Sequence, residues 1–225
     1  MSLIEAENLN ISHIYKKPRE VYKTVDDVSF VIDEGDVVGF VGPGGSGIED
    51  ILDAIAGKED EEIVGKLKVG AKVGYVDFKE DMSYTCDKYI KEHFKNGYDR
   101  AKFLEAARIC QVDDYIPRTW NQLSIHQKVR MLIAIHLGAG AKIIILRNID
   151  PLTVKPFLIE YIAILKNQNA TVLCDLNSLP QGIEAVESVM VMKLGKIVQY
   201  DLLEDIKKTK DEFVRGYFDN HWVKL

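Results

Sequence analysis

Short apolar stretches and glycine-rich turns alternate along the chain, and their spacing predicts its secondary structure. Apolar, β-branched stretches bounded by turn residues predict strands over 4–11, 28–32, 36–41, 71–76, 142–146, 171–174 and 188–192. Apolar residues that recur every three or four positions predict helices over 49–56, 101–110, 125–137 and 156–167. Because strands alternate with helices, we expect an α/β fold around a mainly parallel sheet that is covered on both faces.

The remaining stretches complete a predicted single domain over residues 1–225. The turn at 33–35 separates two predicted strands and predicts a tight hairpin between them. Residues 78–121 show no strong strand pattern, so we expect an inserted helical subdomain over about 78–137. The segment at about 202–217 combines charged and apolar positions, which predicts an amphipathic helix.

Composition narrows the classes of protein to which the chain can belong. With 225 residues, 47% hydrophobic and 28% charged, the chain can bury a core, which argues against disorder or a coiled coil. The net charge of −6 offers no basic surface, so we expect no nucleic-acid partner. No apolar stretch approaches the roughly 20 residues that cross a bilayer, so we expect no direct membrane insertion. Three widely spaced cysteines fit a reducing cytoplasm.

A glycine-rich turn joins a predicted strand directly to a predicted helix, and it is the chain's most informative motif. Its sequence is Gly42-Pro-Gly-Gly-Ser-Gly47. Such a turn lets backbone N–H groups converge on a phosphate at the start of the helix. A phosphate loop would continue with lysine and then serine or threonine, whereas this chain continues with Ile48 and Glu49. The loop alone therefore leaves an ordinary strand-to-helix turn as the alternative.

Further segments follow the loop in an order that is typical of one family. They are 122–136, 143–154, 171–178 and 195–198, which match the signature, Walker B with D-loop, switch and late-hairpin segments. From Leu3 to Phe213 the chain thus resembles the nucleotide-binding subunits of ABC transporters, particularly those of polysaccharide and teichoic-acid exporters. The resemblance implies a P-loop NTPase-like nucleotide-binding domain with an N-terminal antiparallel β-subdomain and an inserted helical subdomain.

The same resemblance implies a set of nucleotide-contacting residues. They are Tyr15, Gly42, Gly44, Gly45, Ser46, Gly47 and Ser124. Tyr15 matches the aromatic residue that stacks on adenine, with simple packing as the alternative. His126 and His136 lie ten residues apart, a spacing that does not return them to one helix face, so we expect surface or interface histidines rather than metal ligands.

The chain differs from the family at the positions that perform the chemistry. By resemblance, Ile48 replaces the Walker A lysine and Glu49 the Mg²⁺-binding hydroxyl residue. Arg147 replaces the Walker B aspartate and Asn148 the catalytic glutamate. The Q-loop, second signature glycine, D-loop and switch-histidine positions hold Phe78, His126, Val154 and Asn177. Phosphoryl transfer depends on positioned positive charge and Mg²⁺, so these substitutions argue against catalysis and against ATP and Mg²⁺ as cofactors.

Glu49 and Arg147 suggest a replacement for the lost metal site. In the resembled fold the residues at these two positions approach the same Mg²⁺ from opposite sides, so we expect a direct structural ion pair between them. Glu49 and Asp50 also place two carboxylates at the start of the helix, where phosphate would sit. No residue is assigned to metal binding or catalysis.

The sequence therefore predicts a catalytically inactive ATP-binding-type subunit of an ABC transporter. By resemblance, it would export a cell-surface polysaccharide or a teichoic-acid-like polymer. It would lie in the cytoplasm at the inner face of the membrane and bind a membrane permease. It would pair with a second copy or with an intact paralogue. Two alternatives are a scaffold or regulatory protein that keeps the fold, and a weak ATPase that uses non-standard residues.

Overall fold

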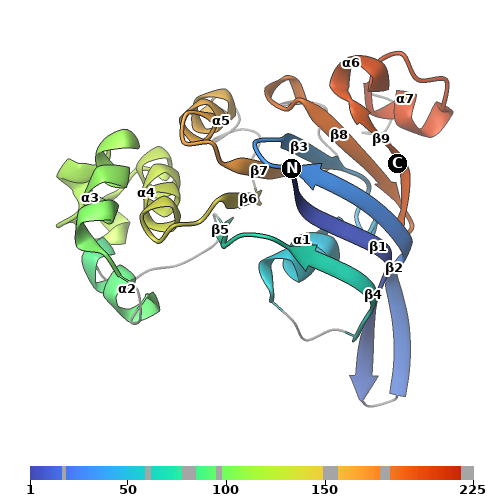
Figure 1. Ribbon diagram of the computed structural model, residues 1–225, viewed down its shortest axis with the longest axis horizontal. Helices are drawn as coiled ribbons and strands as arrows, with labels where there is room; N and C mark the ends of the chain where they lie inside the picture. The colour runs from blue at the N-terminus through green and yellow to red at the C-terminus, as the bar shows by residue number, and fades with distance from the viewer. Residues whose placement is uncertain are drawn as a thin grey trace.

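In the computed structural model, the chain folds into two β-sheets and the helices that cover them (Figure 1). The structure describes residues 1–16, 19–58, 62–77, 85–94, 98–148, 157–177 and 183–218. Among these residues, an antiparallel sheet of order β2-β1-β4 contains β1 (Ser2–Lys16), β2 (Arg19–Asp33) and β4 (Glu62–Val69). The larger sheet, of order β5-β6-β7-β3-β8-β9, contains β3 (Val37–Val41), β5 (Val73–Asp77), β6 (Ile143–Arg147), β7 (Thr171–Asn177), β8 (Ser188–Lys193) and β9 (Lys196–Leu202).

Five of the described α-helices lie between strands in sequence, and two follow the last strand. In chain order, these helices are α1 (Ile48–Ala56), α2 (Cys86–His93), α3 (Arg100–Ile109), α4 (Ile125–Gly138), α5 (Leu158–Lys166), α6 (Leu203–Ile206) and α7 (Glu212–Phe218). Figure 1 shows α2, α3 and α4 grouped at one end of the larger sheet, away from α6 and α7. Among the described residues, no helix has the length and apolar character needed to span a membrane.

The larger sheet is parallel except at one edge and has a core on each face. Strands β5, β6, β7, β3 and β8 run parallel, and β9 pairs antiparallel with β8. Alternate side chains of a strand point to opposite faces, and Ile144 packs with residues of α4 and α5 while Ile145 packs with residues of α1 and β1. The predicted α/β class, with a mainly parallel sheet covered on both faces, is confirmed.

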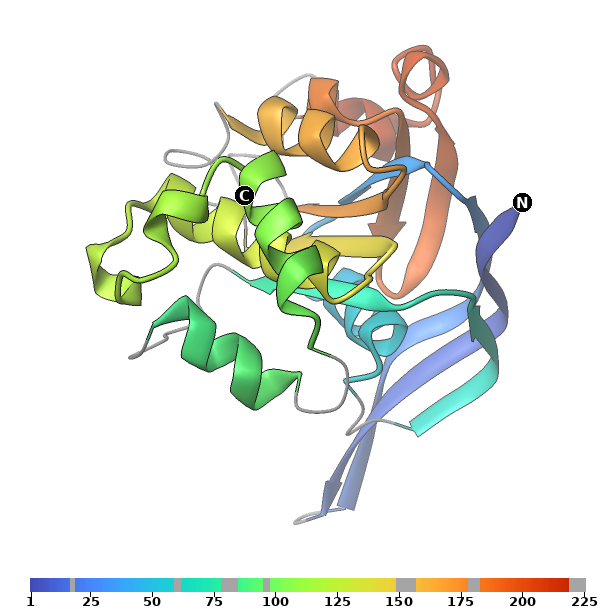
Figure 2. The ribbon, with the colours of Figure 1, turned by 60° about the vertical axis from the view of Figure 1, so that its left-hand side comes forward.

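The hairpin predicted across residues 33–35 is wrong. Strands β2 and β3 belong to different sheets, and β2 instead forms a long hairpin with β1, which projects from the body of the molecule in Figure 2. All five residues of β3 are buried, as suits a central parallel strand. The turn is anchored to β7, because the Gly35 N–H donates to the Thr171 hydroxyl at 2.8 Å. The short turn at 33–35 therefore connects the two sheets and does not pair two neighbouring strands.

The single helix predicted over 202–217 is also wrong. Leu202 is the last residue of β9, and two short helices, α6 and α7, follow it. The Asp211 carboxylate accepts the N–H of Val214 at 2.9 Å, which starts a new helix there. Between β5 and β6 the described residues are helical or irregular apart from an isolated bridge between Thr85 and Thr119, as the predicted insertion requires.

Candidate functional site

The glycine-rich loop connects β3 to α1 with the backbone shape that a strand-to-helix turn requires. Gly47 is the N-cap of α1 with φ of 89°, a left-handed conformation that favours glycine. A Cβ atom on Gly47 would collide with the carbonyl oxygen of Thr24, and one on Gly42 would lie 2.6 Å from the carbonyl oxygen of Met192. The turn after β8 supports the loop from behind, where the Gly195 N–H donates to the Ser46 carbonyl at 3.1 Å.

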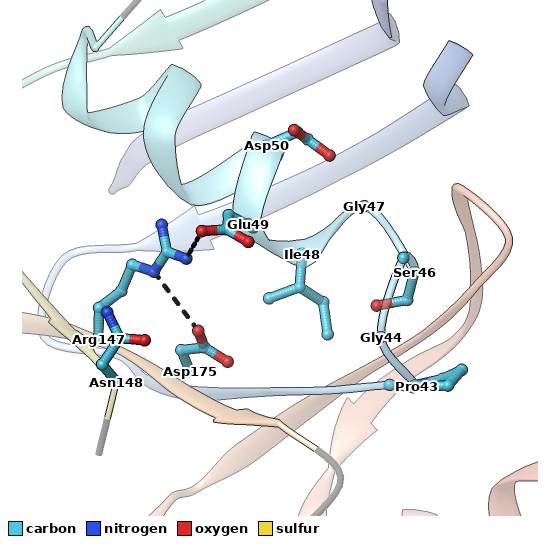
Figure 3. Close-up of a pocket in the computed structure, with 12 residues that line it drawn as sticks. Pro43, Gly44, Ser46, Gly47, Ile48, Glu49, Asp50, Arg147, Asn148 and Asp175 are labelled. Carbon is cyan, nitrogen blue, oxygen red and sulfur yellow. Dashed lines mark hydrogen bonds and ion pairs between the residues drawn. The ribbon is translucent and has the colours of Figure 1, made fainter. Parts of the chain in front are cut away.

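A cavity of about 220 Å³ lies beside this loop and contains the predicted loop residues in its wall (Figure 3). The wall consists of the loop, the start of α1 and the ends of β6 and β7: Gly42, Pro43, Gly44, Gly45, Ser46, Gly47, Ile48, Glu49, Asp50, Arg147, Asn148 and Asp175. Within the described ranges, no group of histidine, cysteine, aspartate and glutamate has the arrangement to hold a metal ion. The ionisable side chains of the wall are three carboxylates and one guanidinium.

Arg147, the last residue of β6, extends from the sheet toward α1 and forms the centre of this wall. Its side chain is 6% exposed, and its Nη2 atom forms an ion pair with Glu49 (Figure 3). Its Nη1 atom lies 3.0 Å from Oδ1 of Asp53 and donates to the Tyr75 hydroxyl at 2.7 Å. Its Nε atom lies 3.5 Å from Oδ2 of Asp175, which is itself 4% exposed. One guanidinium therefore connects α1 to strands β5 and β7.

Burial and hydrogen bonding together fix the charge states in this cluster. Burial alone would lower the pKa of Arg147, but hydrogen bonds to Glu49 and Tyr75 outweigh it, so that the pKa is raised. Burial and the hydrogen bond to Asp53 raise the pKa of Tyr75. The neutral Tyr75 hydroxyl thus donates to Asp53 at 2.5 Å while it accepts from the charged Arg147.

Asn148 and Asp50 extend the cluster on either side of the cavity. Asn148 has φ of 54°, a left-handed conformation that asparagine tolerates better than most residues. Its side-chain amide donates to Oδ1 of Asp77 at 2.8 Å. On the opposite side, Oδ1 of Asp50 lies 2.8 Å from Nε2 of His13 in β1. Both carboxylates that the sequence predicts at the start of α1 therefore have positively polarised partners.

Comparison with solved structures identifies the fold of the chain. The chain superposes on cbiO1 from Clostridium perfringens, part of the transporter complex cbiONQ, with a TM-score of 0.75 over all of this chain and 99% of the other, at 16% identity. It superposes on the ADP form of MJ1267, an ATP-binding cassette, with a TM-score of 0.73 over 97% and 99%, at 18% identity. The fold is the ABC-ATPase nucleotide-binding fold.

Sequence relatives agree with this ABC fold. The chain is 24% identical to the carnitine transport ATP-binding protein OpuCA of Listeria monocytogenes over 93% of this chain and 59% of the relative. It is 27% identical to an uncharacterized ABC transporter ATP-binding protein, MJ1023, of Methanocaldococcus jannaschii over 88% and 78%. No family model matches the chain. The chain spans about 60% of the length of OpuCA and of the choline transport relative OpuBA of Bacillus subtilis.

Ser124, at the ABC signature position, does not belong to the cavity wall. It is the N-cap of α4, and its hydroxyl accepts the Gln127 N–H at 3.3 Å while the Gln127 side chain accepts the Ser124 N–H at 2.9 Å. This capping box satisfies two polar groups that a helix start otherwise leaves open. Two residues after Ser124, the ring of His126 packs against Phe157. Its Nδ1 atom forms a hydrogen bond with the Tyr161 hydroxyl at 2.5 Å.

Several of the predicted ABC positions lie outside the described residues. Phe78 and Val154 are among them, and for Tyr15 and Asn177 the strand backbone is described but the side chain is not. The expectation that His136 is a surface or interface residue needs correction, because it is only partly exposed and its Nε2 atom bonds the Tyr75 carbonyl at 3.0 Å.

Sequence reasoning missed three members of the Arg147 cluster, namely Asp53, Tyr75 and Asp175. Asp53 follows Glu49 by four positions on α1, so a helical projection places both on one face. Asp175 stands between the buried apolar residues Cys174 and Leu176, and a lone carboxylate in such a place signals a buried cation nearby. Tyr75 carries no comparable signal, because a tyrosine in an edge strand of a sheet is ordinary.

Proposed function

We propose that this chain is an ATP-binding-type subunit of an ABC transporter that neither binds Mg²⁺-ATP productively nor hydrolyses it. The observation that carries the proposal is the position of Arg147. Its guanidinium lies between α1 and the ends of β6 and β7 and contacts Glu49 directly. By the resemblance, the two substituted residues face each other where a metal and its two ligands would otherwise stand.

The start of α1 supports the same conclusion. Ile48 is 5% exposed and belongs to the core that includes α1, so the first residue of the helix offers no charge to a phosphate. Glu49 is largely exposed at 71% of its side-chain surface and brings a negative charge to the helix start. Carboxylates at this place interact favourably with the helix dipole and compete with any other anion.

The charge balance of the cavity also disfavours a triphosphate. Its wall carries the carboxylates of Glu49, Asp50 and Asp175 against the single guanidinium of Arg147, which leaves a net charge of −2 when all four are ionised. Phosphoryl transfer requires positive charge around the transferred group. Here the positive charge already has three carboxylate partners, namely Glu49, Asp53 and Asp175.

The proposed partner is a membrane permease, with the chain at the inner face of the membrane and paired with a second copy or an intact paralogue. The names of the relatives support a role in transport. They refer to transport of carnitine and choline and to import of oligosaccharides, so they lend no support to export of a polysaccharide or a teichoic-acid-like polymer. The transported solute is therefore the part of the proposal that depends on the initial resemblance alone.

A second candidate is a scaffold or regulatory protein that uses the fold only as a binding surface. The capping box at Ser124 favours it, because the Ser124 hydroxyl is already used within its own helix. Co-purification with a permease from membranes separates the two candidates. Recovery of a permease supports the transporter subunit, and a partner set without any membrane protein supports the scaffold.

Mg²⁺-dependent ATP turnover by the purified chain tests the loss of hydrolysis. The matched control is Gly44→Glu, because a Cβ atom at Gly44 meets no atom within 4 Å and the added carboxylate lies beside the cavity. We expect the same background rate from both proteins, since neither hydrolyses ATP. Turnover by the natural chain that Gly44→Glu abolishes would overturn the proposal.

A further inference from the structure

Tyr75 lies at a junction between the Arg147 cluster and the helices between β5 and β6. Its hydroxyl binds Asp53 of α1 at 2.5 Å and Arg147 of β6 at 2.7 Å. Its backbone carbonyl accepts a hydrogen bond from Nε2 of His136, in α4, at 3.0 Å. A carbonyl can only accept, so the His136 ring carries its proton on Nε2. A single residue thus contacts the helix after the glycine-rich loop and the helix after the signature position.

The sequence around Tyr75 favours this close approach. A Cβ atom on Gly74 would lie 2.5 Å from the Cβ atom of His136, so glycine allows α4 to lie directly on β5. The His136 ring also meets the Phe94 ring edge-on, with centroids 6.2 Å apart, and Phe94 directly follows α2. His136 therefore connects α4, β5 and the end of α2.

Further side-chain contacts fix the Tyr75 ring and the end of β5. Nζ of Lys58, beyond the end of α1, lies 3.1 Å from the centre of the Tyr75 ring. Two residues farther along β5, Asp77 accepts the side-chain amide of Asn148, which follows Arg147. The end of β5 is therefore attached to α1, β6 and α4 by side-chain contacts as well as by its pairing with β6.

We propose that Tyr75 is a positioning residue that locks α4 to α1: its carbonyl is held by His136 of α4 and its hydroxyl by Asp53 of α1 and by Arg147, so that these elements form one rigid unit without a bound ligand. The lock consists of hydrogen-bonded polar groups that are buried, as in Arg147, or partly buried, as in Tyr75, Asp53 and His136, and their contributions reinforce one another. The lock rests on the proposed function in one respect only: it requires that a nucleotide does not displace Arg147 from its contacts. Two separate measurements keep the lock and the proposed function distinguishable.

Hydrogen exchange of the full chain, followed by mass spectrometry, tests the lock. Tyr75→Phe removes the hydroxyl and keeps the ring. We expect exchange to become about fivefold faster in both α1 and the second half of α4, because one partly buried hydrogen-bonding group is lost. The matched control is Tyr200→Phe, which alters a half-buried tyrosine of β9 outside the cluster. It leaves exchange in α1 and α4 unchanged.

Faster exchange that is confined to α1 would overturn the lock, and so would a uniform increase that Tyr200→Phe reproduces. If Tyr75→Phe fails to fold, His136→Phe tests the junction from α4: it removes the hydrogen bond to the Tyr75 carbonyl and is expected to speed exchange in α1. Addition of Mg²⁺-ATP to the natural chain is the separate test of the proposed function. Slower exchange of the glycine-rich loop after addition of Mg²⁺-ATP would overturn the proposed function. The lock is tested separately, by the exchange rates of the variants.

Discussion

The backbone of the glycine-rich loop and the side chains around it have different relations to the ABC family. The loop keeps its glycines, with a left-handed Gly47 at the start of α1 and a close approach of Gly42 to β8. By the resemblance, the charged positions around the loop differ from those of the family, and Arg147 binds Glu49 at the edge of the cavity. The fold requires the backbone shape of the loop, because a Cβ atom at Gly42 or Gly47 would collide with neighbouring backbone. The charged side chains around the loop depend instead on what the site binds.

This difference separates two kinds of constraint on the same few residues. Substitution of a glycine whose Cβ would strike neighbouring backbone costs stability whether or not a nucleotide binds. Substitution of a charged residue costs stability only through its present partners. Variants of the loop glycines and of Arg147 therefore separate the two kinds of constraint.

The largest effect is expected at the loop backbone. Gly47→Val would force a β-branched residue into a left-handed conformation and into the carbonyl oxygen of Thr24. We expect a loss of more than about 4 kcal/mol in the free energy of unfolding, or no folding at all. Urea denaturation measures the change. Gly44→Ala is the control, with an expected change of about 0.5 kcal/mol or less, and equal effects at the two positions would contradict the account of the loop.

Arg147 is expected to come next. Arg147→Met removes the cation and leaves the buried Asp175 and the partly buried Asp53 without it. Loss of one partner in a buried ion pair costs about 3–5 kcal/mol. The control is Glu49→Gln, for which we expect about 1 kcal/mol or less because that carboxylate is mostly exposed. Equally small losses for both variants in urea would show that Arg147 is not the centre of the cluster.

The direct contact between Glu49 and Arg147 gives a smaller, pairwise effect. A double-mutant cycle with Glu49→Gln and Arg147→Met should show a coupling free energy of about 0.5–1 kcal/mol, because the two residues contact each other and share solvent exposure on one side. The four unfolding free energies are measured at one salt concentration. Strictly additive effects would mean that the pair makes no contribution of its own.

The smallest effect concerns pH and lies at the start of α4. Burial, with a contribution from Arg130, lowers the pKa of His126 below its usual value near 6.5. The unfolded chain therefore binds a proton more readily, so the stabilisation is complete above about pH 6.5 and is lost as pH falls through the lower folded pKa. His126→Gln should flatten the fall in unfolding free energy below pH 6.5. Parallel curves for the natural chain and the variant would contradict this assignment.

The sequence predicted the parallel core well because buried parallel strands are continuous apolar runs. Ile143 to Leu146 are wholly buried in β6, where the apolar run placed a strand. The long hairpin of β1 and β2 was predicted only in part. Ile14, Val21 and Tyr22 of this hairpin are exposed, so its strand character depends on pairing between distant segments more than on burial.

The contact between Glu49 and Arg147 could be expected from the order of the motifs, whereas the rest of the cluster could not. Tyr75 and Asp175 come from the two strands that flank β6, so that both reach Arg147 because of the strand order β5-β6-β7. That order is a property of the folded sheet, since these strands are separated by helices in the sequence. The part of the site that depends on sheet order therefore appeared only with the structure.

Calorimetric titration of the natural chain with ATP, with and without Mg²⁺, is the most direct test of the central claim that Arg147 and its carboxylates occupy the site in place of Mg²⁺-ATP. The account predicts no saturable heat at micromolar to millimolar ATP and no effect of Mg²⁺, because the guanidinium already has its partners. Saturable, Mg²⁺-dependent binding at micromolar ATP would contradict it.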